Sequence, residues 1–375
     1  PSAPAEAPAG AVPVADLEAL WRLSRGEGQR IAVIDTGVNR HPRLAHVEPG
    51  GDYVSAGDGT QDCDGHGTVV AGIIAATADP DDPSSFAGIA PAATLLTIRQ
   101  STVRFGPAAD PAETGFGDVD TMARAVRTAA DLGATVINIS SVACAAGPLD
   151  DAPLGAALAY AVDVKDVVVV TAAGNVGGAG QCPSQQRSAQ MDWASATVAV
   201  SPAWYDDYVL TVGSVNDRGE PSAFTLAGPW VDVAAPGENL TALDPAGSGT
   251  ISTLPGPGGP APISGTSYAA PIVSGLAALI RSAFPRLTAR QVMQRIEATT
   301  RPPRRGRDPL VGYGIVDPVA ALRSESSGTP ATAAATPPTE ESRPTDSARV
   351  TAIVGAGVCV AMLVVLWSAA RLRRP

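Results

Sequence analysis

Residues 30–38 have the sequence RIAVIDTGV, and this stretch decides the fold. Four apolar residues precede Asp35, and a Thr-Gly pair follows it. A short apolar run that ends at an acid and a glycine turn predicts a buried parallel strand. On the C-terminal side of this stretch, strand-like runs alternate with helical patterns. Such alternation is typical of an α/β fold with a mostly parallel central sheet.

Apolar runs predict further strands at residues 93–99, 135–140, 167–171, 208–215 and 230–234. Helical spacing of apolar residues predicts helices at residues 67–77, 119–132, 154–162, 266–284 and 288–299. Thr288 is expected to cap the last of these helices. In parallel sheets, functional groups gather at the C-terminal ends of the strands. Asp35 and the residues that follow the other strands are therefore the first candidates.

The composition excludes several classes of protein. The 375 residues include 26 Lys and Arg against 37 Asp and Glu, which gives a formal charge of −11. An acidic chain of this kind is not expected to bind nucleic acid, which calls for a basic face. The 39 glycines and 34 prolines exclude a coiled coil, and the overall composition excludes a multi-span membrane protein and a wholly disordered chain.

Residues 350–370, VTAIVGAGVCVAMLVVLWSAA, contain no charged side chain. A helix needs about 20 apolar residues to cross a bilayer, so this stretch predicts one transmembrane helix. The alternative, a buried core helix, is disfavoured because little chain follows to cover it. Arg371, Arg373 and Arg374 place the tail 371–375 in the cytoplasm by the positive-inside rule. The N-terminal bulk of the chain is then expected outside the cell membrane.

The rest of the chain divides into three parts. Residues 324–349 are rich in Pro, Ser and Thr and lack large apolar residues, so they predict a disordered stalk. Residues 1–20 are expected to form an N-terminal extension. No signal peptide is visible, and an exported chain needs one, so we expect it to be absent from this sequence or already removed. Residues 21–323 are expected to form the folded domain.

Three motifs carry the chemistry. Asp35 closes the first strand, His66 lies in DGHGTVVAG, and Ser267 lies in SGTSYAAPIVSG. A serine hydroxyl attacks a carbonyl only if a base removes its proton, and imidazole is the side-chain base whose pKa lies near neutrality. A carboxylate on the other ring nitrogen fixes the tautomer and stabilises the imidazolium. The chain order Asp, His, Ser is that of the subtilisin type.

The three motifs resemble the signature segments of the subtilisin-like (S8) serine proteases and span most of the folded domain. The resemblance implies a three-layer α/β fold and an acyl-enzyme mechanism. It implies that Asp35 stabilises charge, His66 is the general base and Ser267 is the nucleophile. VVVVTAAGN resembles the segment that ends in the oxyanion-hole asparagine, here Asn175. Two further segments resemble the walls of the substrate pocket: Ser140, Ser141 and Val142, and Ala172, Ala173 and Gly174.

Each of these residues also has a more ordinary interpretation. A lone Asp or Ser at such a place is usually a turn residue or a helix cap, and a protease that has lost activity would keep the fold. The presence of all four expected catalytic residues argues against such decay. His41 and His46 are expected to be structural, and Asp64 is expected to cap a helix. Residues 58–64 are expected to form solvated turns rather than a calcium site. No metal and no cofactor is expected.

A protease domain followed by a Pro-rich stalk, one C-terminal membrane helix and an Arg-rich tail resembles the mycosins. Mycosins are membrane-anchored proteases of actinobacterial type VII (ESX) secretion systems. The resemblance implies a location in the cell envelope, association with the secretion membrane complex and cleavage of a few secreted polypeptides. The alternative is a mainly structural component that stabilises this complex, with proteolysis dispensable.

Three cysteines lie outside the predicted membrane segment, so at most one disulfide forms among them. Cys144 follows the strand that ends at Ser140, and Cys182 follows the loop after Asn175. Both are expected on the same rim of the site, which predicts a Cys144–Cys182 disulfide. The sequence leaves the partner of Cys63 open.

Overall fold

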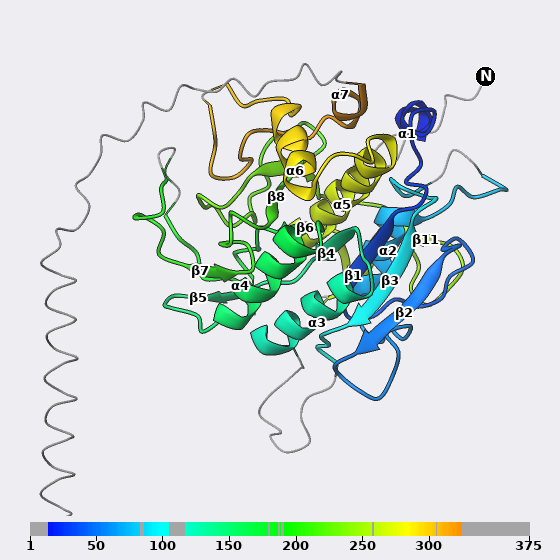
Figure 1. Ribbon diagram of the computed structural model, residues 1–375, viewed down its shortest axis with the longest axis horizontal. Coiled ribbons are helices and arrows are strands. Elements are labelled where there is room, and N and C mark those ends of the chain that lie inside the picture. Colours follow the sequence, from blue (N-terminus) through cyan, green and yellow to red (C-terminus); the bar gives the residue numbers. More distant parts are fainter. Residues whose placement is uncertain are drawn as a thin grey trace, which may run out of the picture. The chain divides into compact units, whose positions relative to one another are not determined.

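The computed structural model describes residues 14–82, 86–104, 117–178, 181–186, 188, 191–256, 259–304 and 306–323 (Figure 1). The predicted stalk 324–349, membrane helix 350–370 and tail 371–375 lie outside the described residues, as do the first 13 residues of the predicted extension. Among the helices that are described, none has the length and apolar character needed to cross a membrane.

A parallel sheet forms the centre of the described region, and all of its strand pairs are parallel. From one edge to the other, its strands are β2 (Val47–Asp52), β3 (Thr94–Arg99), β1 (Arg30–Asp35), β4 (Val136–Ile139), β6 (Val168–Ala172), β8 (Leu210–Val215) and β9 (Val233–Pro236). Every residue of β4, β6 and β8 is buried, as expected for a sheet that is covered on both faces.

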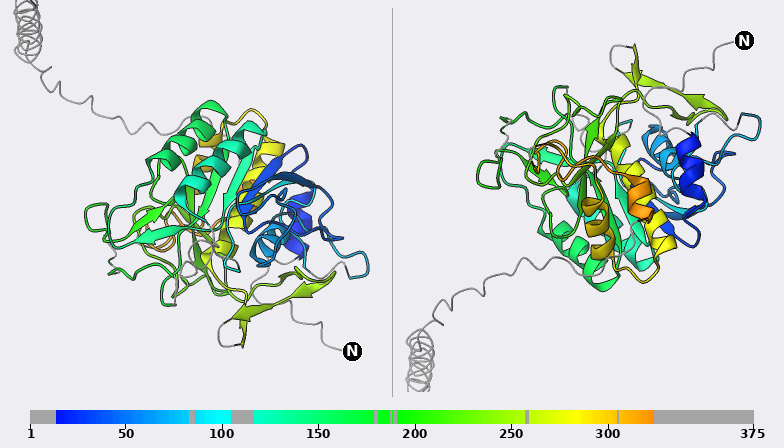
Figure 2. Two further views of the ribbon diagram at one scale, coloured as in Figure 1. Left: turned by 90° about the horizontal axis from the view of Figure 1, so that it is seen from below. Right: turned by 90° about the horizontal axis from the view of Figure 1, so that it is seen from above.

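Helices cover both faces of this sheet (Figure 2). One face packs against α2 (His66–Ala75) and α5 (Thr266–Ala283), with α6 (Ala289–Ala298) beside α5. The other face packs against α3 (Val119–Asp131), α4 (Ala152–Ala159) and the π-helical turn η1 (Tyr160–Val164). These three layers confirm the predicted α/β architecture.

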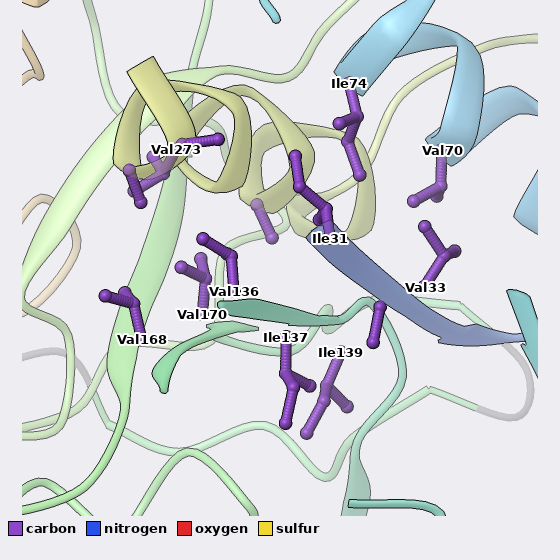
Figure 3. Close-up of a cluster of buried hydrophobic side chains, with 14 of the residues drawn as sticks. Ile31, Val33, Val70, Ile74, Val136, Ile137, Ile139, Val168, Val170 and Val273 are labelled. Atoms are coloured by element: carbon purple, nitrogen blue, oxygen red, sulfur yellow. The ribbon is translucent and has the colours of Figure 1, made fainter. Parts of the chain in front are cut away.

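The pleat of the strands divides their side chains between the two layers of helices (Figure 3). Ile31 points toward Ile74 of α2, and Val136 points to the same side of the sheet as Val273 of α5. Ile137 and Ile139 point to the opposite side. All of these side chains except Ile74 belong to β1, β4 or α5, and all belong to one hydrophobic core. This shared core holds β1, β4 and α5 in fixed positions relative to one another, and it therefore also positions their ends.

Smaller elements complete the described region. Three short antiparallel pairs are β5 (Ala143–Ala145) with β7 (Ala199–Ser201), β10 (Ala242–Leu243) with β11 (Thr250–Ile251), and β12 (Thr253–Gly256) with β13 (Gly259–Pro262). Helix α1 (Val14–Trp21) precedes β1, and α7 (Pro318–Arg323) lies at the other end of the described chain. Leu17 and Leu20 of α1 are buried in the main core, so packed structure begins before the predicted domain boundary at residue 21.

The six strands of the short antiparallel pairs were not predicted, and two strands of the central sheet differ from the sequence-based expectation. The strand expected at residues 230–234 begins only at Val233, because the backbone turns between Gly228 and Val231 and Trp230 packs into a separate cluster. Strand β2 has the sequence VEPGGD, which contains a proline and two glycines and therefore did not suggest a strand. It is an edge strand with an irregular register between Pro49 and Gly51, where such residues are tolerated.

Candidate active site

Asp35 and His66 meet where β1 ends and α2 begins. Asp35 is the last residue of β1, and His66 is the first residue of α2. Gly65 precedes the helix at φ 85°, in the left-handed region that glycine adopts without strain, and this turn directs the imidazole toward the strand end. His66 Nδ1 lies 2.7 Å from Asp35 Oδ1. The Asp35 carboxylate is 2% exposed, whereas 28% of the imidazole remains accessible.

The charge of Asp35 sets the properties of His66. Burial opposes the charged imidazolium, but the adjacent Asp35 carboxylate outweighs it, and Asp62 and Asp64 add to the effect, so the pKa of His66 is raised. The same Asp35 oxygen accepts the backbone N–H of Thr36 at 2.7 Å, which holds the carboxylate in place. Because Nδ1 faces Asp35, the other ring nitrogen is left for a reacting group.

The Asp62 side chain connects the end of β1 to the start of α2. One carboxylate oxygen accepts hydrogen bonds from the Thr36 hydroxyl at 2.9 Å and the Gly65 N–H at 2.7 Å. The other oxygen accepts the N–H and the hydroxyl of Thr68 at 2.8 and 2.6 Å. Burial raises the pKa of Asp62, although these hydrogen bonds act in the opposite direction. The carboxylate is thus an anchor between the end of β1 and the first turn of α2.

The expectation that residues 58–64 form solvated turns is therefore wrong for Asp62, which is 6% exposed. The expectation that Asp64 caps the helix is also wrong. The N-cap residue is Gly65, and it makes no side-chain capping bond. Asp64 instead accepts hydrogen bonds from the Thr102 hydroxyl and from the Val103 N–H, which lie in the segment after β3.

Ser267 is the second residue of α5, and its side chain is 8% exposed. A buried chain of hydrogen bonds fixes this end of the helix against β4. The Ser274 hydroxyl donates to Asn138 Oδ1 at 2.8 Å, Asn138 Nδ2 donates to Ser140 Oγ at 2.9 Å, and Ser140 Oγ donates to the Ser267 carbonyl at 2.8 Å. The Ser267 hydroxyl itself makes no hydrogen bond to the described residues, so it is available to a ligand.

Asn175 lies beside Ser267 with its amide oriented by Thr266. Its Oδ1 accepts the N–H and the hydroxyl of Thr266, each at 3.0 Å. With the carbonyl oxygen engaged, the Nδ2 donors face away from Thr266. A side chain at Gly265 would place its Cβ 3.2 Å from Ser267 Oγ and 3.4 Å from Asn175 Nδ2. Glycine at this position therefore keeps open a space that both polar groups border.

One cavity of about 450 Å³ brings the motifs together, because its walls include Asp35, His66, Asn175 and Ser267. Among the described residues there are two larger cavities, of about 740 and 820 Å³, but neither is lined by serine, cysteine or histidine. We therefore take the 450 Å³ cavity as the candidate active site on its chemistry rather than its size.

Five of the six residues expected to wall the substrate pocket line this cavity, namely Ser140, Ser141, Val142, Ala172 and Gly174. The sixth, Ala173, is fully buried in the hydrophobic cluster behind the wall. Gly174 adopts φ +97°, and a Cβ there would lie 3.0 Å from the Cys182 sulfur and 3.4 Å from Val142 Cγ2. Only glycine fits this wall without strain.

The structure contains a disulfide between Cys144 and Cys182, with the Cα atoms 5.2 Å apart. Both cysteines line the cavity, as the sequence predicts for residues of one rim. Cys63 is exposed and free. No cluster of three or more His, Cys, Asp or Glu side chains suitable for a metal ion occurs in the described part of the chain.

Sequence reasoning did not identify Asp62 or Thr266, which orient the groups around them. Asp62 lies in an acidic run just before α2, where a helix N-terminus favours carboxylates, and that signal could have drawn attention to it. Tyr268 was also missed. Its ring centroid lies 5.1 Å from that of His66, so it packs beside the imidazole.

The geometry agrees with comparisons to known proteins. Residues 26–314 match the model of the subtilase family (peptidase S8). Mycosin-4 of Mycobacterium tuberculosis is 62% identical over 374 residues, which cover 96% of this chain and 82% of that protein.

Two solved structures are similar over most of the chain. The MycP3 protease from the type VII (ESX-3) secretion system is 47% identical, with a TM-score of 0.78 over 86% of this chain and 90% of that chain. A chain in the periplasmic assembly from the ESX-5 inner membrane complex is 43% identical, with a TM-score of 0.78 over 88% of this chain and 86% of that chain. The chain therefore belongs to the subtilase family of serine proteases and, within it, to the mycosins.

Proposed function

We propose that this subtilase is a membrane-anchored, extracytoplasmic serine endopeptidase that cleaves polypeptides at the cavity described above. The observation that carries the proposal is the 2.7 Å contact between Asp35 and His66 in the same cavity as the unbonded hydroxyl of Ser267. A buried carboxylate, an imidazole and a free serine hydroxyl are the groups that acyl transfer requires.

In the proposed reaction, Ser267 Oγ attacks the carbonyl carbon of the scissile peptide and His66 Nε2 takes the hydroxyl proton. Asp35 stabilises the imidazolium that forms. The negative oxygen of the tetrahedral intermediate accepts hydrogen bonds from Asn175 Nδ2 and from the Ser267 N–H at the start of α5. The C–N bond then breaks as His66 returns the proton to the leaving amine, and water hydrolyses the acyl-enzyme.

The substrate is proposed to pass between the two walls formed by Ser140, Ser141 and Val142 and by Ala172 and Gly174. The Cys144–Cys182 disulfide links these walls at the rim of the cavity, since each cysteine follows one of them and both line the cavity. Ala173 supports the second wall from the core.

Labelling with a fluorophosphonate probe tests the assignment of the nucleophile. We expect the probe to label the wild type at Ser267, as located by peptide mass spectrometry, and to leave Ser267→Ala unlabelled. Ser282→Ala, which changes a half-buried serine near the C-terminal end of the same helix, is the matched control and should label normally. Equal labelling of Ser267→Ala and wild type would refute the role of Ser267.

The proposed anchor is residues 350–370, with the catalytic domain outside the cytoplasm. Its support is the stretch of 21 residues without charge and the Arg-rich tail. The similarity to Mycosin-4 covers 96% of this chain, and so it extends beyond residue 323 into this segment. A disulfide in the catalytic domain also fits an oxidising compartment. Deleting residues 350–375 should release the protein from the membrane fraction.

We further propose that the protein associates with the membrane complex of a type VII secretion system and processes a few secreted substrates. The similarity to a chain within an ESX-5 periplasmic assembly supports this association and also favours a second function, stabilisation of the complex. Comparing secretion in a Ser267→Ala strain and a deletion strain separates the two functions. Secretion that survives the substitution but fails in the deletion would make the structural function dominant. Secreted proteins whose termini change in the Ser267→Ala strain would identify the substrates.

A further inference from the structure

A cavity of about 360 Å³ lies outside the candidate active site. Only two kinds of side chain line it, aromatic rings and carboxylates: Trp193, Trp204, Tyr205, Tyr208, Asp206 and Asp207. Aromatic residues make up only 4% of the chain, yet they supply four of these six positions. Such a lining differs from both the apolar core and the ordinary charged surface, so it calls for a ligand of specific chemistry.

Two of the rings are held rigidly by a buried acid. The Trp204 indole donates to Asp151 Oδ2 at 2.8 Å, and the Tyr205 hydroxyl donates to Asp151 Oδ1 at 2.9 Å. Asp151 is 4% exposed, and the two rings meet edge to face with centroids 6.2 Å apart. The rings are therefore preorganised before any ligand arrives, which lowers the entropic cost of binding.

Trp193 comes from a different segment and stays in contact with solvent. It is 49% exposed, and its ring lies 6.1 Å from that of the fully buried Trp230. A large indole that is supported from one side and bare on the other offers a free face to a ligand.

The polar groups of the cavity favour a cation. Asp206 is paired with Arg307 at 3.6 Å, but the Asp207 carboxylate has no hydrogen bond or ion pair with the described residues. The Trp204 and Tyr205 donors are already used by Asp151. The Trp193 indole N–H and the Tyr208 hydroxyl are the donors that remain in the lining, so it is the charge of Asp207 and the free ring face that favour an ammonium or guanidinium over a neutral sugar. Arg290 already lies over the Tyr208 ring at 5.4 Å and donates to the Asp207 carbonyl at 2.6 Å, so the free ring face for a ligand is that of Trp193.

We propose that this cavity binds a cationic side chain, the guanidinium of arginine or the ammonium of lysine, from a polypeptide. Asp207 supplies the opposite charge and Trp193 the free ring face. Trp204 and Cys144 pack against the same hydrophobic cluster, and Cys144 also lines the candidate active site. A polypeptide is the occupant because the proposed endopeptidase activity brings polypeptides with basic residues to this protein, so the inference rests on the proposed function.

Binding of small probes to the full chain tests the proposal. Saturation-transfer NMR titrations compare N-acetylarginine amide with N-acetylcitrulline amide, which has nearly the same shape but no charge. We expect the arginine probe to bind at least fivefold more tightly than the citrulline probe. Asp207→Asn and Trp193→Ala should each weaken arginine binding at least threefold. Asp217→Asn, an exposed aspartate at another cavity, is the matched control and should leave it unchanged.

Three results would overturn the proposal. The first is equal binding of the arginine and citrulline probes, because charge would then not be recognised. The second is arginine binding that neither Asp207→Asn nor Trp193→Ala weakens, because the probe would then bind elsewhere. The third is tighter binding of N-acetylglucosamine than of the arginine probe, which would identify a carbohydrate site. Asp207→Asn alters an exposed side chain, so it serves if Trp193→Ala does not fold.

Discussion

The two sides of the active-site cavity are organised by different physical means. On the side of β1 and α2, the carboxylates of Asp35 and Asp62 lie buried within a dense set of hydrogen bonds, and their charge raises the pKa of His66. On the side of α5, Ser267 and Asn175 are neutral, and the space between them depends on Gly265 and on the orientation of one amide. Charge thus sets the pKa of the base, whereas shape and the orientation of dipoles set the geometry of the proposed oxyanion site.

Removing the charge beside His66 should have the largest effect. Asp35→Asn keeps the size of the side chain but no longer stabilises the imidazolium, and it favours the wrong tautomer. We expect the rate constant for peptide cleavage to fall by about 10⁴, as for the same change in a chymotrypsin-type triad. Unfolding monitored by circular dichroism should confirm that the variant is folded. A loss of less than 100-fold would show that the charge of Asp35 does not control how well His66 acts as the base.

Removing the amide on the other side should have a smaller effect. Asn175→Ala removes one donor to the negative oxygen of the intermediate, and the loss known for such a donor in a subtilisin is a factor of about 10²–10³ in kcat. We expect KM to change little, because the donor acts mainly in the transition state. Asn216→Ala, at a half-buried site that does not line the active-site cavity, is the control. An unchanged kcat in Asn175→Ala would remove Asn175 from the mechanism.

The orientation of the amide can be tested without removing it. Thr266→Val deletes the hydroxyl that donates to Asn175 Oδ1 but keeps the backbone N–H that makes the second bond. One such bond is worth about 0.5–1.5 kcal/mol, so kcat should fall by about 2- to 13-fold. Thr266→Ser restores the hydroxyl and should recover most of the rate. If Ser and Val behave alike, lost packing rather than amide orientation is the cause.

The smallest expected effect is a shift in the pH dependence of kcat/KM. The base acts only when neutral, so kcat/KM rises as pH increases through the His66 pKa, which lies above the ordinary value near 6.5. Because the Asp64 carboxylate contributes to this increase, Asp64→Asn should lower the pKa and move the acidic limb of the profile toward lower pH by a few tenths of a unit. Asp58→Asn is the control, since Asp58 is an exposed residue of the same loop whose carboxylate accepts hydrogen bonds from Thr60. A shift toward higher pH in Asp64→Asn would contradict the assigned sign.

Much of the fold could be predicted because the residues of the buried strands are themselves typical of strands. β1, β4, β6 and β8 are short segments rich in Val, Ile and other apolar residues, and α6 is capped by Thr288, whose side chain accepts the Gln291 N–H as the sequence predicts for an N-cap. β2 carries no such signal, because its pairing with β3 rather than its residues makes it a strand.

The groups that line the cavity could be predicted from their motifs, but the groups that hold them could not. Asp62 and Asp64 are two acids in one short run, and their sequence positions do not tell which one is buried. That difference arises from Thr36 and Thr68, which are close to Asp62 only after β1 and α2 have packed. Thr266 is likewise oriented toward Asn175, a residue 91 positions away in the sequence.

The hydrogen-bond chain from Ser274 through Asn138 and Ser140 to the Ser267 carbonyl has a consequence for local unfolding. It joins the proposed nucleophile and one wall of the proposed substrate pocket across the buried centre of the molecule. Neither can move away without breaking a buried polar contact, so the amides of β4 and of the first turns of α5 should exchange with solvent together, as one cooperative unit. Ser267 and the wall that contains Ser140 therefore keep a fixed separation. Other parts of the cavity can move to bind or release a substrate.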